Sequence, residues 1–138
     1  MNVTTKGRYA LRIMLDLAQR PEEGYVSLKS IAERQGISMK YLEAIVGELK
    51  RAELVDSTRG KEGGYKLNRS AADYSVGEIL RNLEDNLAPV ACIRAGSIEC
   101  DHAGECMTVP MWKELDDITN SYLNSVSLEN LLTGDKWK

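Results

Sequence analysis

The sequence has little that would place it among membrane-spanning, disordered or disulfide-stabilised proteins. No apolar run approaches the roughly 20 residues of a transmembrane helix. Lys6, Arg8 and Arg12 stand where a secretory signal would be apolar. Only three of the 138 residues are proline and three are cysteine, and there is no internal repeat. We therefore expect one compact cytoplasmic domain that needs no metal or disulfide merely to fold.

Charge is distributed unevenly along the chain. The formal net charge is −3, which by itself argues against a nucleic-acid-binding protein. However, residues 1–70 carry thirteen Lys/Arg and nine Asp/Glu, a net charge of +4, whereas residues 71–138 carry five and twelve, a net charge of −7. The basic half is therefore able to meet phosphate groups while the acidic half faces elsewhere.

Helical periodicity in the first half predicts a helix-turn-helix. A first amphipathic helix is expected over residues 5–20, before Pro21. Ser27 is the predicted N-cap of a short second helix, and Gly36 suits its left-handed C-cap. A third helix follows at once over residues 38–51. Its predicted buried face, with helical spacing, consists of Leu42, Ile45, Val46 and Leu49.

A hairpin, a loop and three further helices are expected in the rest of the chain. Two short strands over residues 54–68 flank a basic, glycine-rich turn. Ser75 and Glu78 predict a capping box for a fourth helix, and residues 87–107 lack periodicity, as a loop does. Pro110 begins a long helix. A short final helix is expected between Ser127 and Gly134.

The long helix carries an apolar stripe typical of a coiled-coil seam. Its members are spaced by four, three and four residues: Met111, Leu115, Ile118 and Tyr122. Such a stripe favours packing against a partner helix.

A helix-turn-helix followed by a basic hairpin is the order of elements in a winged helix, whose second motif helix enters the DNA major groove. The helix N-terminus favours phosphate, Glu43 can accept from a cytosine amino group, and the hairpin can reach phosphate or the minor groove. The candidate DNA-binding residues are Ser38, Lys40, Tyr41, Glu43, Arg51, Arg59, Gly60, Lys61 and Gly64. The alternative is a helix-turn-helix that binds no DNA, in which Lys40, Glu43 and Glu48 form a solvated face.

The expected loop holds all three cysteines, Cys92, Cys100 and Cys106. Because cytoplasmic thiols stay reduced, we expect these residues to be metal-binding, redox-active or incidental, and not a disulfide framework. Iron-sulfur clusters and zinc commonly take four ligands, and His102, the single histidine, is a tentative fourth. Zinc held by three cysteines and one histidine, or three ordinary thiols in a flexible loop, are the alternatives. The chain has no Cys-x-x-Cys pair and no phosphate-binding glycine motif, so we do not expect an enzyme.

Several separated motifs, in order, resemble the iron-sulfur cluster regulator (IscR) family. They are TKGRYA at residues 5–10, IAERQGIS at 31–38, YLE at 41–43, RG at 59–60 and GGY at 63–65. The resemblance implies a dimeric winged-helix transcription regulator whose long C-terminal helix packs against that of its partner. LKSIA at residues 28–32 also resembles relatives that repress cysteine metabolism and lack the cysteine loop.

The resemblance also implies a 2Fe-2S cluster on the three cysteines, and a role for Glu43 in distinguishing DNA sites. The chain departs from the family at the fourth ligand. Val109 occupies the place of the regulator's histidine, and Arg8 that of the acidic ligand in nitric-oxide-sensing relatives. His102, a nearby carboxylate, a group of the partner chain and an exogenous ligand all stay open. Lys40 and Ala44 also differ from the regulator, so its base preferences do not transfer.

Together these features predict a mainly α winged helix-turn-helix protein with a small β-hairpin wing and a long C-terminal dimerisation helix. We expect a DNA-binding domain over residues 1–86, a cluster-binding loop over 87–107, and dimerisation and final helices over 108–138. The expected function is a homodimeric regulator whose operator binding is modulated by a 2Fe-2S cluster. The alternative is a repressor without a cluster, responding to zinc, thiol oxidation or a protein partner.

Overall fold

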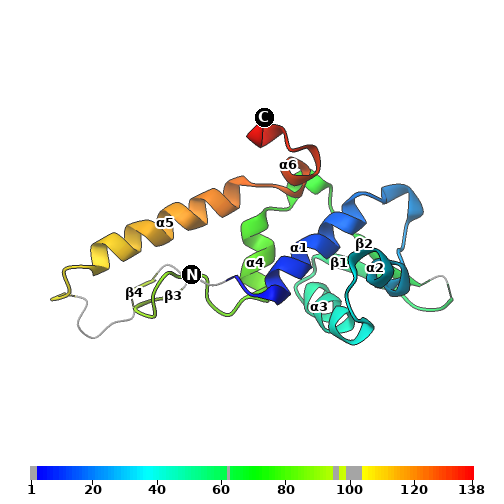
Figure 1. Cartoon of the computed structure of the whole chain (residues 1–138), viewed down its shortest axis with the longest axis horizontal. Coiled ribbons are helices and arrows are strands. Elements are labelled where there is room, and N and C mark those ends of the chain that lie inside the picture. Colours follow the sequence, from blue (N-terminus) through cyan, green and yellow to red (C-terminus); the bar gives the residue numbers. More distant parts are fainter. Residues whose placement is uncertain (1–2, 62, 95–96, 99–103) are drawn as a thin grey trace.

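A helical head carries one long helix that extends away from it (Figure 1). The computed structural model describes residues 3–61, 63–94, 97–98 and 104–138. The helices are α1 (Thr5–Ala18), α2 (Leu28–Gln35), α3 (Met39–Arg51), α4 (Val76–Leu83), α5 (Val109–Ser125) and α6 (Leu128–Thr133). The strands are β1 (Val55–Thr58), β2 (Gly64–Leu67), β3 (Ile93–Arg94) and β4 (Ser97–Ile98), and short 3₁₀ turns span Pro21–Glu23, Ala71–Asp73 and Asp135–Trp137. The expected fold class, a mainly α winged helix-turn-helix, is confirmed.

Side-chain caps define the helix starts that the sequence predicts. The Ser27 hydroxyl oxygen accepts a hydrogen bond from the backbone N–H of Ser30 at 3.2 Å. The Ser38 hydroxyl oxygen accepts one from the backbone N–H of Tyr41 at 3.3 Å. Gly36 ends α2 in the left-handed region at φ +65°, and Gly134 ends α6 in the same way at φ +70°. The first helix ends at Ala18, two residues before the predicted end, and a 3₁₀ turn follows.

Two local predictions need correction. Ser75 caps α4, but the Glu78 carboxylate takes two hydrogen bonds from the Arg69 guanidinium at 2.8 and 3.0 Å in place of the reciprocal half of a capping box. The capping box lies instead at the start of α6, between Ser127 and Asn130. The expected loop over residues 87–107 contains the β3–β4 hairpin, because two-residue strands are too short to show an alternating pattern.

The core lies between α1, α3 and α4 and reaches the wing. The predicted apolar face of α3 is buried throughout, with exposures of 0–1%. Fully buried Tyr74 donates its hydroxyl to the Leu54 carbonyl at 2.8 Å and accepts the N–H of Asn68 at 2.9 Å. These bonds fix both ends of the β1–β2 hairpin to the chain that leads into α4. Val26 joins the sheet through paired bonds with Tyr65 at 2.8 and 2.9 Å.

A buried carboxylate fastens α1 to the helix-turn-helix. Asp16 is 1% exposed, and its two oxygens accept the Arg34 guanidinium at 2.7 and 3.0 Å and the Gln35 amide at 2.9 Å. Arg20 adds an ion pair at 3.5 Å. Burial alone would raise the pKa of Asp16, but hydrogen bonds from Arg34 and Gln35 and the charges of Arg34 and Arg20 outweigh it and lower the pKa.

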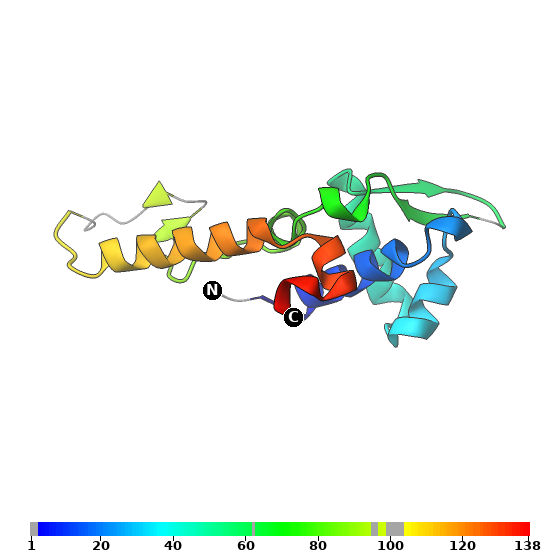
Figure 2. The ribbon, with the colours of Figure 1, turned by 90° about the horizontal axis from the view of Figure 1, so that it is seen from above.

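The long helix α5 projects from the head and uses two different faces (Figure 2). Its inner face packs against α4 and β3 and buries Val109 and Asp116. A second apolar cluster, formed by Val76, Leu80, Leu87 and Val126, holds the ends of α4 and α5 together. None of the described helices combines the length and apolar character required to span a bilayer.

We expect stability to depend on pH through Asp16. A carboxyl group whose pKa is lowered in the folded state stabilises the fold fully above its unfolded pKa of about 3.9, and this contribution is lost as the pH falls below that value. Asp16→Asn should cost about 2–3 kcal/mol at neutral pH, since the partly exposed Arg34 can recover some hydration. Urea unfolding from pH 3 to 7 measures both effects. A difference between Asp16→Asn and the original protein that does not shrink at acid pH would contradict this origin.

Candidate functional site

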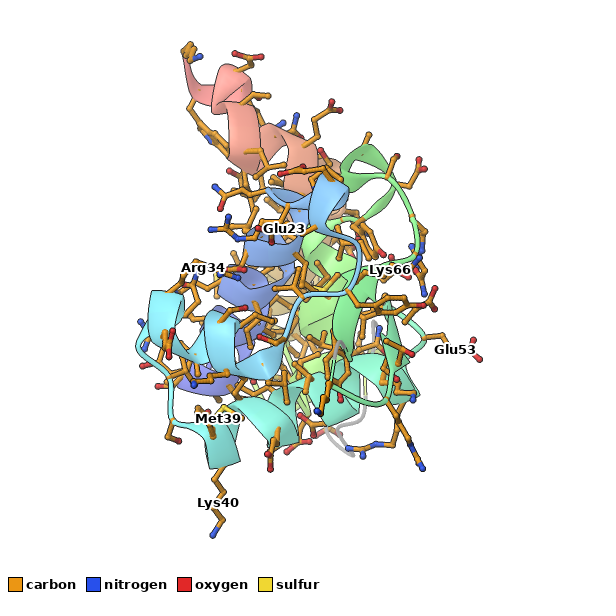
Figure 3. The ribbon with its side chains drawn as sticks, turned by 90° about the vertical axis from the view of Figure 1, so that its right-hand side faces the viewer. Glu23, Arg34, Met39, Lys40, Glu53 and Lys66 are labelled. Atoms are coloured by element: carbon orange, nitrogen blue, oxygen red, sulfur yellow. The ribbon has the colours of Figure 1, made fainter. Side chains whose placement is uncertain are left out.

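The first turn of α3 presents polar side chains at the end of the head. Ser38 is exposed, but its hydroxyl oxygen accepts the N–H of Tyr41 at 3.3 Å and so also serves as the N-cap. Figure 3 shows Lys40 extending away from all other elements. Glu43 is exposed beside it. Tyr41 is half-buried, with its ring edge-on to Tyr9 at 5.8 Å between centroids, so only part of this side chain is accessible.

Of the three residues in the alternative solvated face of α3, Glu48 is not fully exposed to solvent. Glu48 is half-buried and pairs with Lys6 of α1 at 3.4 Å, so it helps to hold the two helices together. Met39, an apolar side chain outside the predicted site, is 42% exposed beside Lys40. Arg51 is exposed in the last turn of the same helix. Accessible groups therefore occur at both ends of α3.

The tip of the wing is a tight turn that exposes two cations. Gly60 has φ +106°, and its carbonyl accepts the N–H of Gly63 at 3.0 Å, which closes the turn. Arg59 and Lys61 are exposed on this turn. The predicted site residue Gly64 has a different environment. It is buried, and a Cβ there would lie 2.2 Å from the Val26 carbonyl oxygen, so β2 needs glycine to approach Val26.

The wing and α3 present exposed cations at the same end of the molecule (Figure 1). Within the described residues, Lys40, Arg51, Arg59 and Lys61 have no carboxylate partner. A shallow depression of about 560 Å³ separates the wing tip from the start of α2. It adds residues that sequence reasoning missed, namely Tyr25, Ser27 and Ser30. Because these residues lie at the start of α2 and just before it, far from the wing in sequence, no short motif connects them to the wing.

Part of the predicted cysteine site is visible. Cys92 and Cys106 are half-buried, whereas Cys100 and the tentative ligand His102 lie outside the described residues. Cys92 directly precedes β3 and Cys106 lies just before α5, and β3 contacts α5. The described part of the chain contains no cluster of three or more metal-ligating side chains.

The surroundings of Cys106 fit a metal-binding thiol. The Thr108 hydroxyl, 3.2 Å from the sulfur, and the backbone N–H groups of Thr108 and Val109 lower the pKa of the Cys106 thiol. A thiolate is the form that binds iron or zinc. The two family positions for a fourth ligand offer no donor: Val109 is 3% exposed and apolar, and Arg8 bonds to Thr5 at 3.3 Å.

A wing, a capped helix-turn-helix and unpaired cations define the chain as a winged-helix protein of the nucleic-acid-binding type. Residues 3–134 match the model of the Rrf2 family, described as iron-dependent transcriptional regulators. The chain belongs to this family. It is therefore a transcriptional regulator similar to IscR, and the expectation that it is not an enzyme is confirmed by the names of its relatives.

Curated relatives and solved structures agree on this family. IscR of Escherichia coli is 38% identical over 99% of this chain and 83% of its own length. The structure of IscR from T. potens has a TM-score of 0.76 at 41% identity, covering 98% of this chain and 88% of that one. CymR, the global cysteine regulator of B. subtilis, has a TM-score of 0.78 at 37% identity, covering 96% and 97%.

The buried position of Gly64 predicts that this glycine matters for the packing of the wing. Gly64→Ala should destabilise the fold by about 1–3 kcal/mol, because its Cβ meets backbone atoms that cannot swing away. Lys61→Ala, three residues earlier and exposed, should leave stability unchanged. Urea unfolding of both variants tests this. Equal stability of Gly64→Ala and the original protein would mean that the sheet tolerates the added methyl group.

Proposed function

We propose that the protein binds a pseudo-palindromic DNA operator as a homodimer. The observation that supports this most directly is a set of exposed cations on α3 and the wing that have no carboxylate partner within the described residues. They lie at the opposite end of the molecule from the β3–β4 hairpin (Figures 1 and 2). In this arrangement α3 of each protomer enters a major groove and the wing lies beside it. The groups that face the groove are Ser38, Lys40, Glu43 and the accessible part of Tyr41.

The remaining candidates are assigned to phosphate and to the wing turn. Arg51, Arg59 and Lys61 contact backbone phosphates or the minor groove. Gly60 supplies the turn that presents Arg59 and Lys61, and Gly64 lets the wing pack on Val26. These two glycines therefore act through the shape of the wing.

The exposed stripe of α5 supports the dimer. Met111, Leu115, Ile118 and Tyr122 are 41–59% exposed on the outer face of the helix. Burial of this apolar area against the same stripe of a second copy would remove it from water and set the spacing of the two DNA-reading heads. After α5, Leu132 and Trp137 are also exposed apolar side chains, at 36% and 52%.

We further propose that Cys92, Cys100 and Cys106 hold a 2Fe-2S cluster, with the fourth ligand open between His102, a carboxylate, a partner-chain group and an exogenous ligand. The thiolate-favouring surroundings of Cys106 and the IscR relatives support this. The cluster would supply a redox-sensitive group in the segment between α4 and α5. Buried Leu87 ties the start of that segment to α4 and to Val126, so ordering of the segment acts on the α4–α5 junction.

This proposal implies a DNA-binding part over residues 1–86, a cluster segment over 87–107 and a dimerisation part over 108–138. A regulator without a cluster is the second candidate. CymR supports it, because this regulator of cysteine matches the chain as well as IscR does, and one solved CymR structure is of an oxidised form. In that case zinc, thiol oxidation or a protein partner is the signal.

Arg59→Ala should weaken operator binding by about 1–3 kcal/mol if this residue makes a specific contact. The physical reason is the loss of an unpaired guanidinium at the wing tip. Fluorescence anisotropy with a duplex enriched by the original protein from a random library measures the affinity. Glu22→Ala, an exposed change in the 3₁₀ turn after α1, is the control. Unchanged affinity of Arg59→Ala would remove it from the interface.

Protein purified without oxygen should show 2Fe-2S absorbance in the visible range, with matching iron and sulfide contents. Cys92→Ala should abolish the absorbance yet leave a folded dimer in gel filtration, because the α5 stripe is separate from the thiols. A colourless protein that resists cluster reconstitution would favour the second candidate, and its zinc content would then separate a zinc site from free thiols. Loss of the dimer in Cys92→Ala would show that the two roles are linked.

A further inference from the structure

The outer face of α3 contains a glycine that the protomer itself does not require. Lys40, Ala44, Gly47 and Arg51 follow one another at spacings of four, three and four residues, so they share one face of the helix. This face lies opposite the fully buried side chains Leu42, Ile45 and Leu49. Gly47 is partly exposed near the middle of the helix, where glycine is the least favourable residue apart from proline.

The other described glycines within helices have an internal explanation. A Cβ on Gly7 of α1 would lie 2.1 Å from a Glu84 carboxylate oxygen that accepts hydrogen bonds from Thr4. A Cβ on Gly77 of α4 would lie 2.3 Å from the Asn124 amide oxygen, which accepts a hydrogen bond from Arg81. Hydrogen-bonded side chains from other parts of the fold therefore occupy the space beside both glycines.

Gly47 has no such neighbour. A Cβ built there meets one group within 4 Å, the Arg51 guanidinium at 3.7 Å, which is an ordinary van der Waals contact. Its backbone is that of a regular helix, without the positive φ that would call for glycine. The cost to helix stability is therefore not repaid inside the protomer by any contact that the structure describes.

We propose that Gly47 lets the DNA backbone approach α3 closely at its third turn, so that the helix contacts the groove along its length and Arg51 reaches a phosphate. This inference rests on the proposed operator binding and extends it beyond the first turn of the helix. A side chain at this position would hold the duplex away from the helix axis. Ala44, also exposed and small, keeps the preceding turn equally open. Gly47 is therefore a positioning residue.

The proposal predicts opposite effects on stability and on DNA binding. Gly47→Ala should raise the Tm by a few degrees, because alanine is the better helix former and its Cβ fits. The same change should lower operator affinity. Gly47→Gln introduces a longer side chain that favours the helix and leaves the net charge unchanged. This variant should lower operator affinity by at least about tenfold. It should also reduce the salt dependence of binding, because Arg51 no longer reaches a phosphate.

The test uses the full chain and a duplex enriched from a random library by the original protein. Thermal unfolding and anisotropy titrations over a range of salt concentrations are measured for Gly47→Ala, Gly47→Gln and the control Gly77→Ala. The control should show no comparable rise in Tm, because its Cβ displaces Asn124, and should keep the original affinity.

Higher Tm of Gly47→Ala together with weaker binding by both Gly47 variants supports the proposal. Original affinity and salt dependence in Gly47→Gln would overturn it while leaving operator binding in place. A lower Tm of Gly47→Ala would also overturn it, since packing inside the protein would then explain the glycine. If the original protein enriches no sequence, the proposed function fails and this inference fails with it.

Discussion

The position of the helix-turn-helix depends on the buried carboxylate of Asp16. A charge taken out of water is costly unless it is paired and hydrogen-bonded, and Asp16 finds its partners in Arg34 and Gln35 at the end of α2. Any shift of α2 against α1 would deprive this charge of its hydrogen bonds from Arg34 and Gln35 and leave only the longer ion pair with Arg20. Because Gly36 follows directly and sets the turn into α3, the carboxylate on α1 also fixes the direction of α3.

The opposite end of α1 is held by a second carboxylate. Glu84 accepts the N–H and hydroxyl of Thr4 at 2.9 and 2.8 Å, at the N-terminus of α1, where negative charge is favourable. Glu84 directly follows α4 and precedes buried Leu87, which begins the cysteine segment. One helix thus joins the base of the proposed cluster segment to the helix-turn-helix. In the proposed regulator, a change in the cluster segment could therefore act through α1 on the position of the proposed DNA-binding helices.

The long helix α5 packs against its own protomer with one face and exposes an apolar stripe on the other. Its inner face holds Val109 and Asp116 against the rest of the protomer, while the outer face leaves a regular apolar stripe exposed. Asp116 is 3% exposed, and within the described residues one of its oxygens has no hydrogen-bond partner. The outer stripe is the part of the proposed dimer that sequence spacing could identify.

Local signals in the sequence determined the helices, their caps and the wing. Ser27, Ser38 and Gly36 act through bonds and φ angles within a few residues, and the apolar spacing of α3 reports which face is buried. Resemblance added the family, which the comparisons confirm. The cap at Ser75 was also local, but the partner of Glu78 was not, because Arg69 reaches it across a turn.

Only the tertiary structure decided which polar residues hold the fold together and which face outward. The sequence gives no sign that Asp16 is buried, that Glu48 pairs with Lys6, or that Tyr41 packs on Tyr9, because these contacts join residues from different helices. The same holds for glycine. Gly64 is required by the approach of Val26, whereas a Cβ on Gly47 would make only an ordinary contact with Arg51. The sequence shows the same residue type at both positions. Spacing along the chain determines local geometry, but burial and close approach are set by what other segments bring to each position.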